Sequence, residues 1–360
     1  MKSILGYTRT SLDTFDERPF CQVDSLVLSS IAYTFFPKEI LPEGDWNGIH
    51  FADLLKAECF EQMFHGIWNG KSCLELLIAL ACSPRFRDIL ICGYTQKYDA
   101  ATEKQFSAVT FRLTPDTSYI AFRGTDSSII GWKEDFNMAF QDPIAGQLEA
   151  IRYLHEAASH FPGMLYLGGH SKGGNLAVYA SVFARPSVKK RIITVYNNDG
   201  PGFDSNFVKH PDYLAILPRI KSIVPYCSVV GMLLNHDGDY EVVKSSQSGL
   251  MQHDSMSWQV IGPDFETEQE LSPKSKRLNA ALSAWIDGLT REQRAEFVDT
   301  LFSLVTASGA KNLSEISTAR FKNINAVLKS FRELDKSERA MILKIFASLT
   351  GEIGKAYKSN

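Results

Sequence analysis

The sequence lacks a basic excess, a zinc-type cysteine spacing and an apolar run long enough to cross a bilayer. Lys and Arg number 38 against 41 Asp and Glu, for a formal net charge of −3, which argues against a nucleic-acid partner. The six cysteines are scattered with no C-x-x-C pair, so we expect no metal site and buried thiols in a reducing compartment. The longest uncharged apolar stretch, residues 222–235, contains a proline and falls short of the roughly 20 residues of a membrane span.

The beginning of the chain, "MKSILGYTRTSLD", has too few consecutive apolar residues for a secretory signal. Hydrophobic residues make up 44% and charged residues 22% of the 360 positions, ordinary values for a globular protein. The sequence shows no internal repeat and no low-complexity segment. We therefore expect a soluble, cytoplasmic protein consisting of one large domain with an appendage.

The order of apolar patterns along the chain predicts an α/β fold. Residues 1–87 have mostly helical patterns, and three strand-like segments follow at short separations that favour antiparallel pairing. From residue 130 helical and strand-like segments alternate, which predicts a mostly parallel sheet with helices on both faces. Active sites in such sheets lie at the carboxyl ends of the strands, where Ser171, Asp199 and Gly231 fall.

After Pro263 the chain becomes charged and helical. Thr290 with Gln293, and Asp335 with Glu338, each fit a helix N-cap with its partner three residues later. Apolar residues then recur at helical spacing, namely Phe297, Val298, Leu301, Phe302 and Val305, and later Ile342, Leu343, Ile345, Phe346 and Leu349. We expect residues 1–265 to form the main domain and residues 266–360 a helical cap or bundle.

The stretch "MLYLGGHSKGGNLAVYA", residues 164–180, predicts a nucleophilic serine on a tight turn. An apolar strand runs into G-x-S-x-G and then directly into a helix, so Ser171 would occupy a strained bend where only glycines fit on either side. The pentapeptide alone arises by chance in roughly one chain in ten of this length. Its position between strand and helix makes a nucleophile the favoured interpretation over an ordinary turn.

A serine nucleophile needs a base and an acid that orients the base. His253, 82 residues after Ser171 in the loop "GLMQHDSMSW", is the favoured base because a triad ordered Ser, acid, His would place it there. For the acid we favour Asp199, in the turn after a strand, with Asp237 and Asp239 as alternatives. We expect the His170 side chain to point away from the reacting face.

Two matched motifs resemble the class 3, fungal-type lipases of the α/β-hydrolase superfamily. "YIAFRGTDSSIIGWKEDF" is similar to their Arg-Gly-Ser/Thr and Trp-x-x-Asp pattern, and Gly-His-Ser-Lys-Gly-Gly to their elbow. Further segments, among them "HSKGGNLAVYA", "NNDGPGF" and "QHDSMSW", resemble a bacterial branch of lipase-like proteins with a domain of unknown function. The resemblance covers roughly residues 15–260 and implies the α/β-hydrolase fold.

The resemblance also implies roles around the serine. Thr125 would supply one oxyanion-hole donor and the backbone N–H of Lys172 the other, while Asp135 would orient the Thr125 loop and Trp132 would pack it. Since only the Lys172 backbone would be required, we expect its side chain to be of no consequence. The class 3 lipases carry their acid after the next strand, where this chain has Ser228, so the acid is expected to have moved to Asp199.

These observations predict a serine hydrolase that cleaves a carboxylic ester, a lipid or another acyl ester, without a metal or organic cofactor. The segment "SVVGMLLNHDGDY" would line a greasy acyl pocket or form a lid, and an exposed apolar face at residues 232–234 would allow peripheral membrane contact. The alternative is a hydrolase-like fold kept as a binding or scaffolding module, which the missing acid at the usual strand favours.

Overall fold

The computed structural model describes residues 2–307 except residues 68, 127–128 and 139, together with residues 331, 332, 339, 340, 343 and 347. The predicted cap at Asp335 and Glu338 lies outside the described residues. Of the second apolar series only Leu343 is described, and its side chain is exposed.

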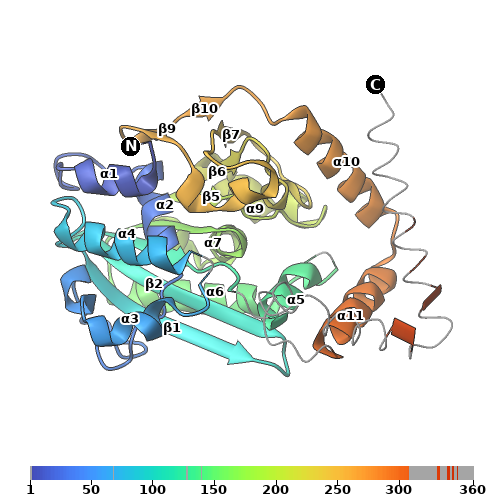
Figure 1. Cartoon of the computed structure of the whole chain (residues 1–360), viewed down its shortest axis with the longest axis horizontal. Coiled ribbons are helices and arrows are strands. Elements are labelled where there is room, and N and C mark those ends of the chain that lie inside the picture. Colours follow the sequence, from blue (N-terminus) through green and yellow to red (C-terminus); the bar gives the residue numbers. More distant parts are fainter. Residues whose placement is uncertain are drawn as a thin grey trace.

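An eight-stranded mixed sheet forms the centre of the molecule, in the strand order β1-β2-β3-β4-β5-β6-β7-β10 (Figure 1). The strands are β1 (Leu90–Asp99), β2 (Lys104–Thr114), β3 (Thr117–Phe122), β4 (Met164–His170), β5 (Ile192–Asn198), β6 (Ile220–Pro225), β7 (Tyr240–Val243) and β10 (Thr267–Glu268). β1, β2 and β3 pair antiparallel, β3 to β7 pair in parallel, and β10 pairs antiparallel with β7. A short hairpin of β8 (Val260–Ile261) and β9 (Asp264–Phe265) stands apart.

Helices connect the parallel strands, as right-handed crossovers between parallel neighbours require. The helices between β3 and β6 are α5 (Ile129–Asn137), α6 (Ala145–His160), α7 (Lys172–Phe183), α8 (Pro186–Lys189) and α9 (Pro211–Ile216). Before the sheet come α1 (Ile4–Thr10), α2 (Gln22–Ile31), α3 (Ala57–Phe64) and α4 (Gly70–Cys82). Short 3₁₀ helices are η1 (Phe51–Leu54), η2 (Phe207–Lys209), η3 (Leu217–Arg219), η4 (Val230–Met232), η5 (Gly249–His253) and η6 (Ser255–Ser257).

Both faces of the sheet are covered by apolar layers. On β3, Tyr119 and Ala121 pack against a cluster that includes residues of α1, α2 and α4, whereas Ile120 and Phe122 pack against residues of α6 and α7. Successive strand residues point to opposite faces, so this alternation divides the core into two layers. The predicted α/β-hydrolase architecture, a mostly parallel sheet between helices with antiparallel strands at one edge, is confirmed.

Two further helices, α10 (Pro273–Asp287) and α11 (Arg291–Ala307), follow the sheet. The predicted cap at Thr290 is confirmed, because Thr290 Oγ1 accepts from the Gln293 amide and Gln293 Oε1 from the Thr290 amide. α11 packs on α5, where Lys133 Nζ lies 2.7 Å from Asp299 Oδ1. Among the described residues no helix is long and apolar enough to span a membrane.

A buried ion pair fixes the amino-terminal helices beneath the sheet. Arg85 binds both carboxylate oxygens of Asp24, at 2.8 and 2.5 Å, and both side chains are fully buried. Asp24 also accepts from the Tyr7 hydroxyl at 2.7 Å and from the Cys21 amide at 2.9 Å. These contacts join α1, the start of α2 and the turn after α4.

Replacing Asp24 by Asn should lower the free energy of unfolding by about 3–5 kcal/mol, because the Arg85 charge would stay buried without its counter-ion. Urea unfolding at pH 7 measures this difference. Asp13, an exposed partner of Arg18, is the matched control, and Asp13→Asn should cost less than about 1 kcal/mol. Equal midpoints for the two variants would contradict the expectation.

Candidate active site

Ser171 lies on the bend between β4 and α7, at the carboxyl edge of the parallel strands. Its backbone has φ 58° and ψ −132°, a conformation that costs a residue with a side chain on the order of 1–3 kcal/mol. The Ser171 amide donates to the Asn198 carbonyl on β5 at 2.9 Å. A Cβ added to Gly173 would lie 2.0 Å from the Phe122 carbonyl oxygen, so a glycine is required there. Ser171 is half-buried.

The structure brings His253 and Asp199 together. His253 ends η5, and its Nδ1 lies 2.6 Å from Asp199 Oδ2, while Asp199 follows β5 and is fully buried. The His253 side chain is 29% exposed. With Nδ1 occupied by the carboxylate, Nε2 is the ring nitrogen left for proton transfer. The alternative acids, Asp237 and Asp239, are exposed in the loop before β7.

The other oxygen of the Asp199 carboxylate is also bound. Oδ1 accepts from the Ser228 hydroxyl at 2.5 Å and from the Gly231 amide at 3.1 Å. Asp199 itself has a φ of 52°, and a Cβ on Gly231 would lie 2.1 Å from Oδ1. Ser228, which occupies the place where an acid was expected from the resemblance, thus donates a hydrogen bond to Asp199, the candidate acid after the neighbouring strand.

Ser171 and His253 both belong to the described part of the chain, and the structure has no hydrogen bond between Ser171 Oγ and the His253 ring. Such bonds are often long in an enzyme without substrate and tighten when the substrate binds. The His253 ring lies beside that of His170, with ring centroids 4.6 Å apart, and residue 170 directly precedes the serine. The candidate base is therefore held next to the bend by its contact with the His170 ring.

Thr125 lies in the loop after β3, and its hydroxyl donates a short hydrogen bond to Asp135 Oδ2 on α5. The bond expected between the two residues is present. Burial raises the pKa of Asp135 to about 6, although the Lys172 charge and the Thr125 hydrogen bond lower it. The amide of Lys172 opens α7, where the first N–H groups of a helix have no partner within the helix. The side chain of Trp132 lies outside the described residues.

The expectation that the Lys172 side chain has no consequence is wrong. It is fully buried, and its Nζ binds Glu134 Oε2 at 2.8 Å, Gln105 Oε1 at 2.7 Å and the Gln105 carbonyl at 3.0 Å. A buried ammonium group is tolerated only with such partners. Sequence pattern could not show this contact, because Glu134 is 38 positions away.

His170 also has a role that sequence reasoning missed. Its Nε2 lies 2.7 Å from the His253 carbonyl and its Nδ1 lies 3.1 Å from the Tyr33 hydroxyl. A carbonyl accepts only from an N–H, so Nε2 carries the proton and Nδ1 accepts from Tyr33. Burial lowers the pKa of His170 to about 3. This neutral imidazole fixes the backbone of the candidate base.

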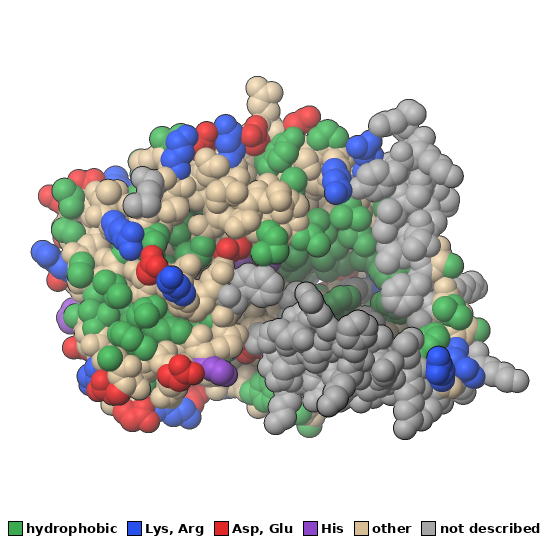
Figure 2. All heavy atoms as spheres, viewed as in Figure 1, with side chains coloured by type: hydrophobic (Ala, Val, Ile, Leu, Met, Phe, Trp, Pro, Cys, Tyr) green, Lys and Arg blue, Asp and Glu red, His purple; other side chains and the backbone are tan. Residues whose placement is uncertain are grey.

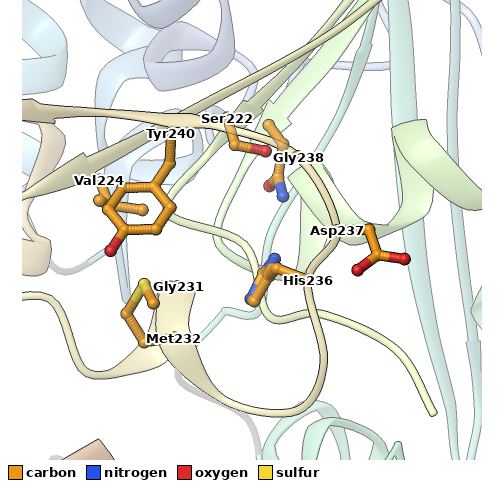
Figure 3. Close-up of a pocket in the computed structure, with 9 residues that line it drawn as sticks. Ser222, Val224, Gly231, Met232, His236, Asp237, Gly238 and Tyr240 are labelled. Carbon is orange, nitrogen blue, oxygen red and sulfur yellow. The ribbon is translucent and has the colours of Figure 1, made fainter. Parts of the chain in front are cut away.

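A small pocket is lined in part by Gly231, whose amide binds Asp199 (Figure 3). Its volume of about 10 Å³ is close to the space that one water needs, so it is no acyl site. The pocket is lined by Asn197, Ser222, Val224, Gly231, Met232, His236, Asp237, Gly238 and Tyr240.

Hydrophobic side chains gather around a hollow on the face drawn in Figure 2, beside α10. The side chains of residues 232–234, which a peripheral membrane contact would need on the surface, are half-buried. Leu250 and Met251, in the 3₁₀ helix that ends at His253, are 66% and 44% exposed.

The neutrality of His170 should appear in the pH dependence of stability. The unfolded chain takes up the proton near pH 6.5 while the folded protein does not until about pH 3, so folding loses stability as the pH falls below 6.5. Between pH 7 and pH 4.5 this group should cost about 2 kcal/mol.

Urea unfolding of the wild type and of His170→Gln at several pH values measures the effect, and the decline should be shallower in the variant. NMR of the imidazole nitrogens should find His170 neutral at pH 5. A protonated ring at that pH would contradict the expectation.

The chain is similar to several solved lipases in fold. The Rhizomucor miehei lipase in its propeptide complex is 19% identical with a TM-score of 0.38, covering 68% of this chain and 72% of that one. A triacylglycerol lipase from Penicillium expansum is 14% identical with a TM-score of 0.33, covering 49% of this chain and 75% of that one. The lipase of Rhizopus microsporus var. chinensis is 15% identical with a TM-score of 0.35, covering 65% and 87%.

No curated protein matches the sequence significantly. The family comparison is more informative, since one family model matches residues 80–303, from the end of α4 into α11, a range that includes Ser171, His253 and Asp199. The chain belongs to the Mbeg1-like family.

Proposed function

We propose that the protein is a serine hydrolase that cleaves a carboxylic ester, a lipid or another acyl ester. The observation that carries the proposal is the hydrogen bond between His253 Nδ1 and the buried Asp199 carboxylate, at the strand edge where Ser171 occupies a strained bend. A serine on such a bend, with a carboxylate-bound imidazole on the neighbouring loop, is the arrangement that acyl transfer by a triad requires.

The chemistry proceeds in two halves. Ser171 Oγ attacks the ester carbonyl while His253 Nε2 takes its proton, and Asp199 stabilises the imidazolium that forms. The tetrahedral intermediate collapses to an acyl-enzyme, and the alcohol leaves with the proton from His253. Water, deprotonated by the same imidazole, then attacks the acyl group and releases the acid. This sequence uses no metal or organic cofactor.

Two donors would stabilise the negative oxygen of the tetrahedral intermediate. The Lys172 amide, at the first position of α7, and Thr125, in the loop after β3, are the candidates. Each donor in such a site typically contributes about 3 kcal/mol to the transition state. The bond from the Thr125 hydroxyl to Asp135 would orient the Thr125 loop.

An apolar acyl group is the substrate part that the molecular surface beside α10 favours. Figure 2 shows hydrophobic side chains around a hollow there, and concave apolar surface is typical of ligand sites. α10 is linked to the candidate acid, because its Asn279 donates to the carbonyl of Ser228, whose hydroxyl binds Asp199. The exposed Leu250 and Met251, close to His253 in sequence, would make the first contact with a lipid aggregate. A water-insoluble ester is therefore the favoured substrate class.

A binding or scaffolding module is the second candidate. It is favoured by the absence, in the described part of the chain, of a hydrogen bond between Ser171 and His253, and by Ser228 at the position where the resemblance predicts an acid. Such a module would keep the buried Asp199 network as a structural element only.

Labelling with a fluorophosphonate probe distinguishes the two candidates. The wild type should form a covalent adduct and Ser171→Ala none, because the probe reports an activated serine. Ser181, buried on α7, provides the control, and Ser181→Ala should label like the wild type. A wild type that stays unlabelled would favour the binding module.

The acid can be identified by three substitutions. Asp199→Asn should lower kcat on a p-nitrophenyl ester by about 10³–10⁴-fold, because the imidazole loses its orienting and charge-stabilising partner. Asp237→Asn and Asp239→Asn should stay within about twofold of the wild type, since both side chains are exposed. A large loss in either control would move the acid to that residue.

A further inference from the structure

Four structural elements meet at the end of the Lys172 side chain. α7 contributes Lys172 itself, β2 contributes Gln105, α5 contributes Glu134, and the Gly146 amide at the start of α6 donates to Glu134 Oε1 at 2.8 Å. Glu134 Oε2 also accepts from the Gln105 amide at 3.1 Å. The three N–H bonds of the ammonium group thus have three acceptors, two on Gln105 and one on Glu134.

Stability alone does not account for a buried ion pair at this place. Taking two charges out of water costs about as much as their attraction returns, and an apolar pair of the same volume often serves as well or better. What the ion pair provides instead is a fixed geometry. It sets the distance between Lys172, the first residue of α7, and the part of α5 that carries Glu134.

The residue after Glu134 is Asp135, which accepts the Thr125 hydroxyl. The Lys172 side chain therefore reaches, through Glu134 and α5, the loop with the second candidate oxyanion donor. Its own backbone N–H is the first candidate donor. One residue thus contributes a donor and also determines where the other donor lies.

We propose that the Lys172 side chain is a positioning residue for the oxyanion site, which it assembles by tying the serine bend to the Thr125–Asp135 pair through Glu134. This inference rests on the proposed hydrolase function. It assigns the substituent at the second variable position of the G-x-S-x-G turn a role in the reaction beyond its amide.

The charges around Asp135 make the proposal testable. Lys172 Nζ lies 3.9 Å from Asp135 Oδ1, and this positive charge lowers the pKa of Asp135, as the nearby His253 also does. Glu134 raises the pKa of Asp135, and the Asp135 charge in turn acts on the Tyr33 hydroxyl. The ionised Asp135 carboxylate binds the Thr125 hydroxyl more strongly than the protonated acid would, so activity should fall when the pH drops through the pKa of Asp135.

The test compares Lys172→Met with Glu134→Gln, measured as kcat and KM on a p-nitrophenyl ester from pH 4.5 to 8. Both variants disturb the same ion pair, so both should lose about tenfold or more in kcat, with KM changed by no more than about threefold. The acidic limb, the part of the pH profile over which kcat falls as the pH is lowered, should move in opposite directions in the two variants. Lys172→Met removes a positive charge and shifts the limb to higher pH, whereas Glu134→Gln removes a negative charge and shifts it to lower pH.

Two controls isolate the effect. Lys189→Met removes a partly buried lysine that pairs with Asp212 away from the site, and its pH profile should match the wild type. In an Asp135→Asn background neither the Lys172 nor the Glu134 substitution should move the acidic limb. A shift of the acidic limb that persists in the Asp135→Asn background would come from the titration of His253 instead of Asp135.

A folded Lys172→Met protein with wild-type kcat and an unshifted limb would overturn the proposal, as would limbs that move in the same direction. If Lys172→Met shows no native circular dichroism, Glu134→Gln decides by the direction of its shift. A wild type that the fluorophosphonate probe does not label on Ser171 would remove the proposed function instead. Normal labelling with unaffected Lys172 and Glu134 variants would remove this inference alone.

Discussion

The bend at Ser171 is the constraint on which the other features of the site depend. A side chain at φ 58° and ψ −132° persists only where the surroundings compensate for the strain. Here β5 binds the Ser171 amide through Asn198, and β3 leaves room only for a glycine at position 173. The strands that hold the bend are the same ones that end in the Thr125 loop and in Asp199. The packing that strains the serine therefore also gathers its candidate partners.

The candidate acid illustrates how a residue on one strand could take the role of a residue on the next. Asp199 follows β5, whereas the resemblance predicts a carboxylate after β6, where Ser228 is found. Neighbouring parallel strands end at the same edge of the sheet, so a carboxylate on either can reach the same imidazole. The Ser228 hydroxyl and the Gly231 amide both donate hydrogen bonds to Asp199 Oδ1. Three hydrogen-bond partners around the buried Asp199 carboxylate fix its orientation.

Sequence patterns could predict the parts of the molecule that depend on local chemistry. The succession of an apolar strand, a glycine-rich turn and a helix predicted the bend at Ser171. The alternation of strand-like and helical segments predicted the parallel sheet between helices. The pairing of His253 with Asp199 followed from chain order and strand ends. The contacts of Lys172 with Glu134 and of His170 with the His253 carbonyl could not be predicted, because no motif or order of residues along the chain connects these positions. Such contacts follow from how helices pack on the sheet, and no periodicity encodes them.

The helices after the sheet contact both halves of the candidate site. On α10, Ser275 Oγ and Asn279 Nδ2 donate to the Ser228 carbonyl, in the same residue whose hydroxyl binds Asp199. On α11, Asp299 pairs with Lys133, next to Glu134 on α5. One helix thus contacts the residue that binds the candidate acid, and the other contacts the helix that carries Asp135. Both helices therefore help to position side chains of the candidate site, and the family match extends into α11, through residue 303.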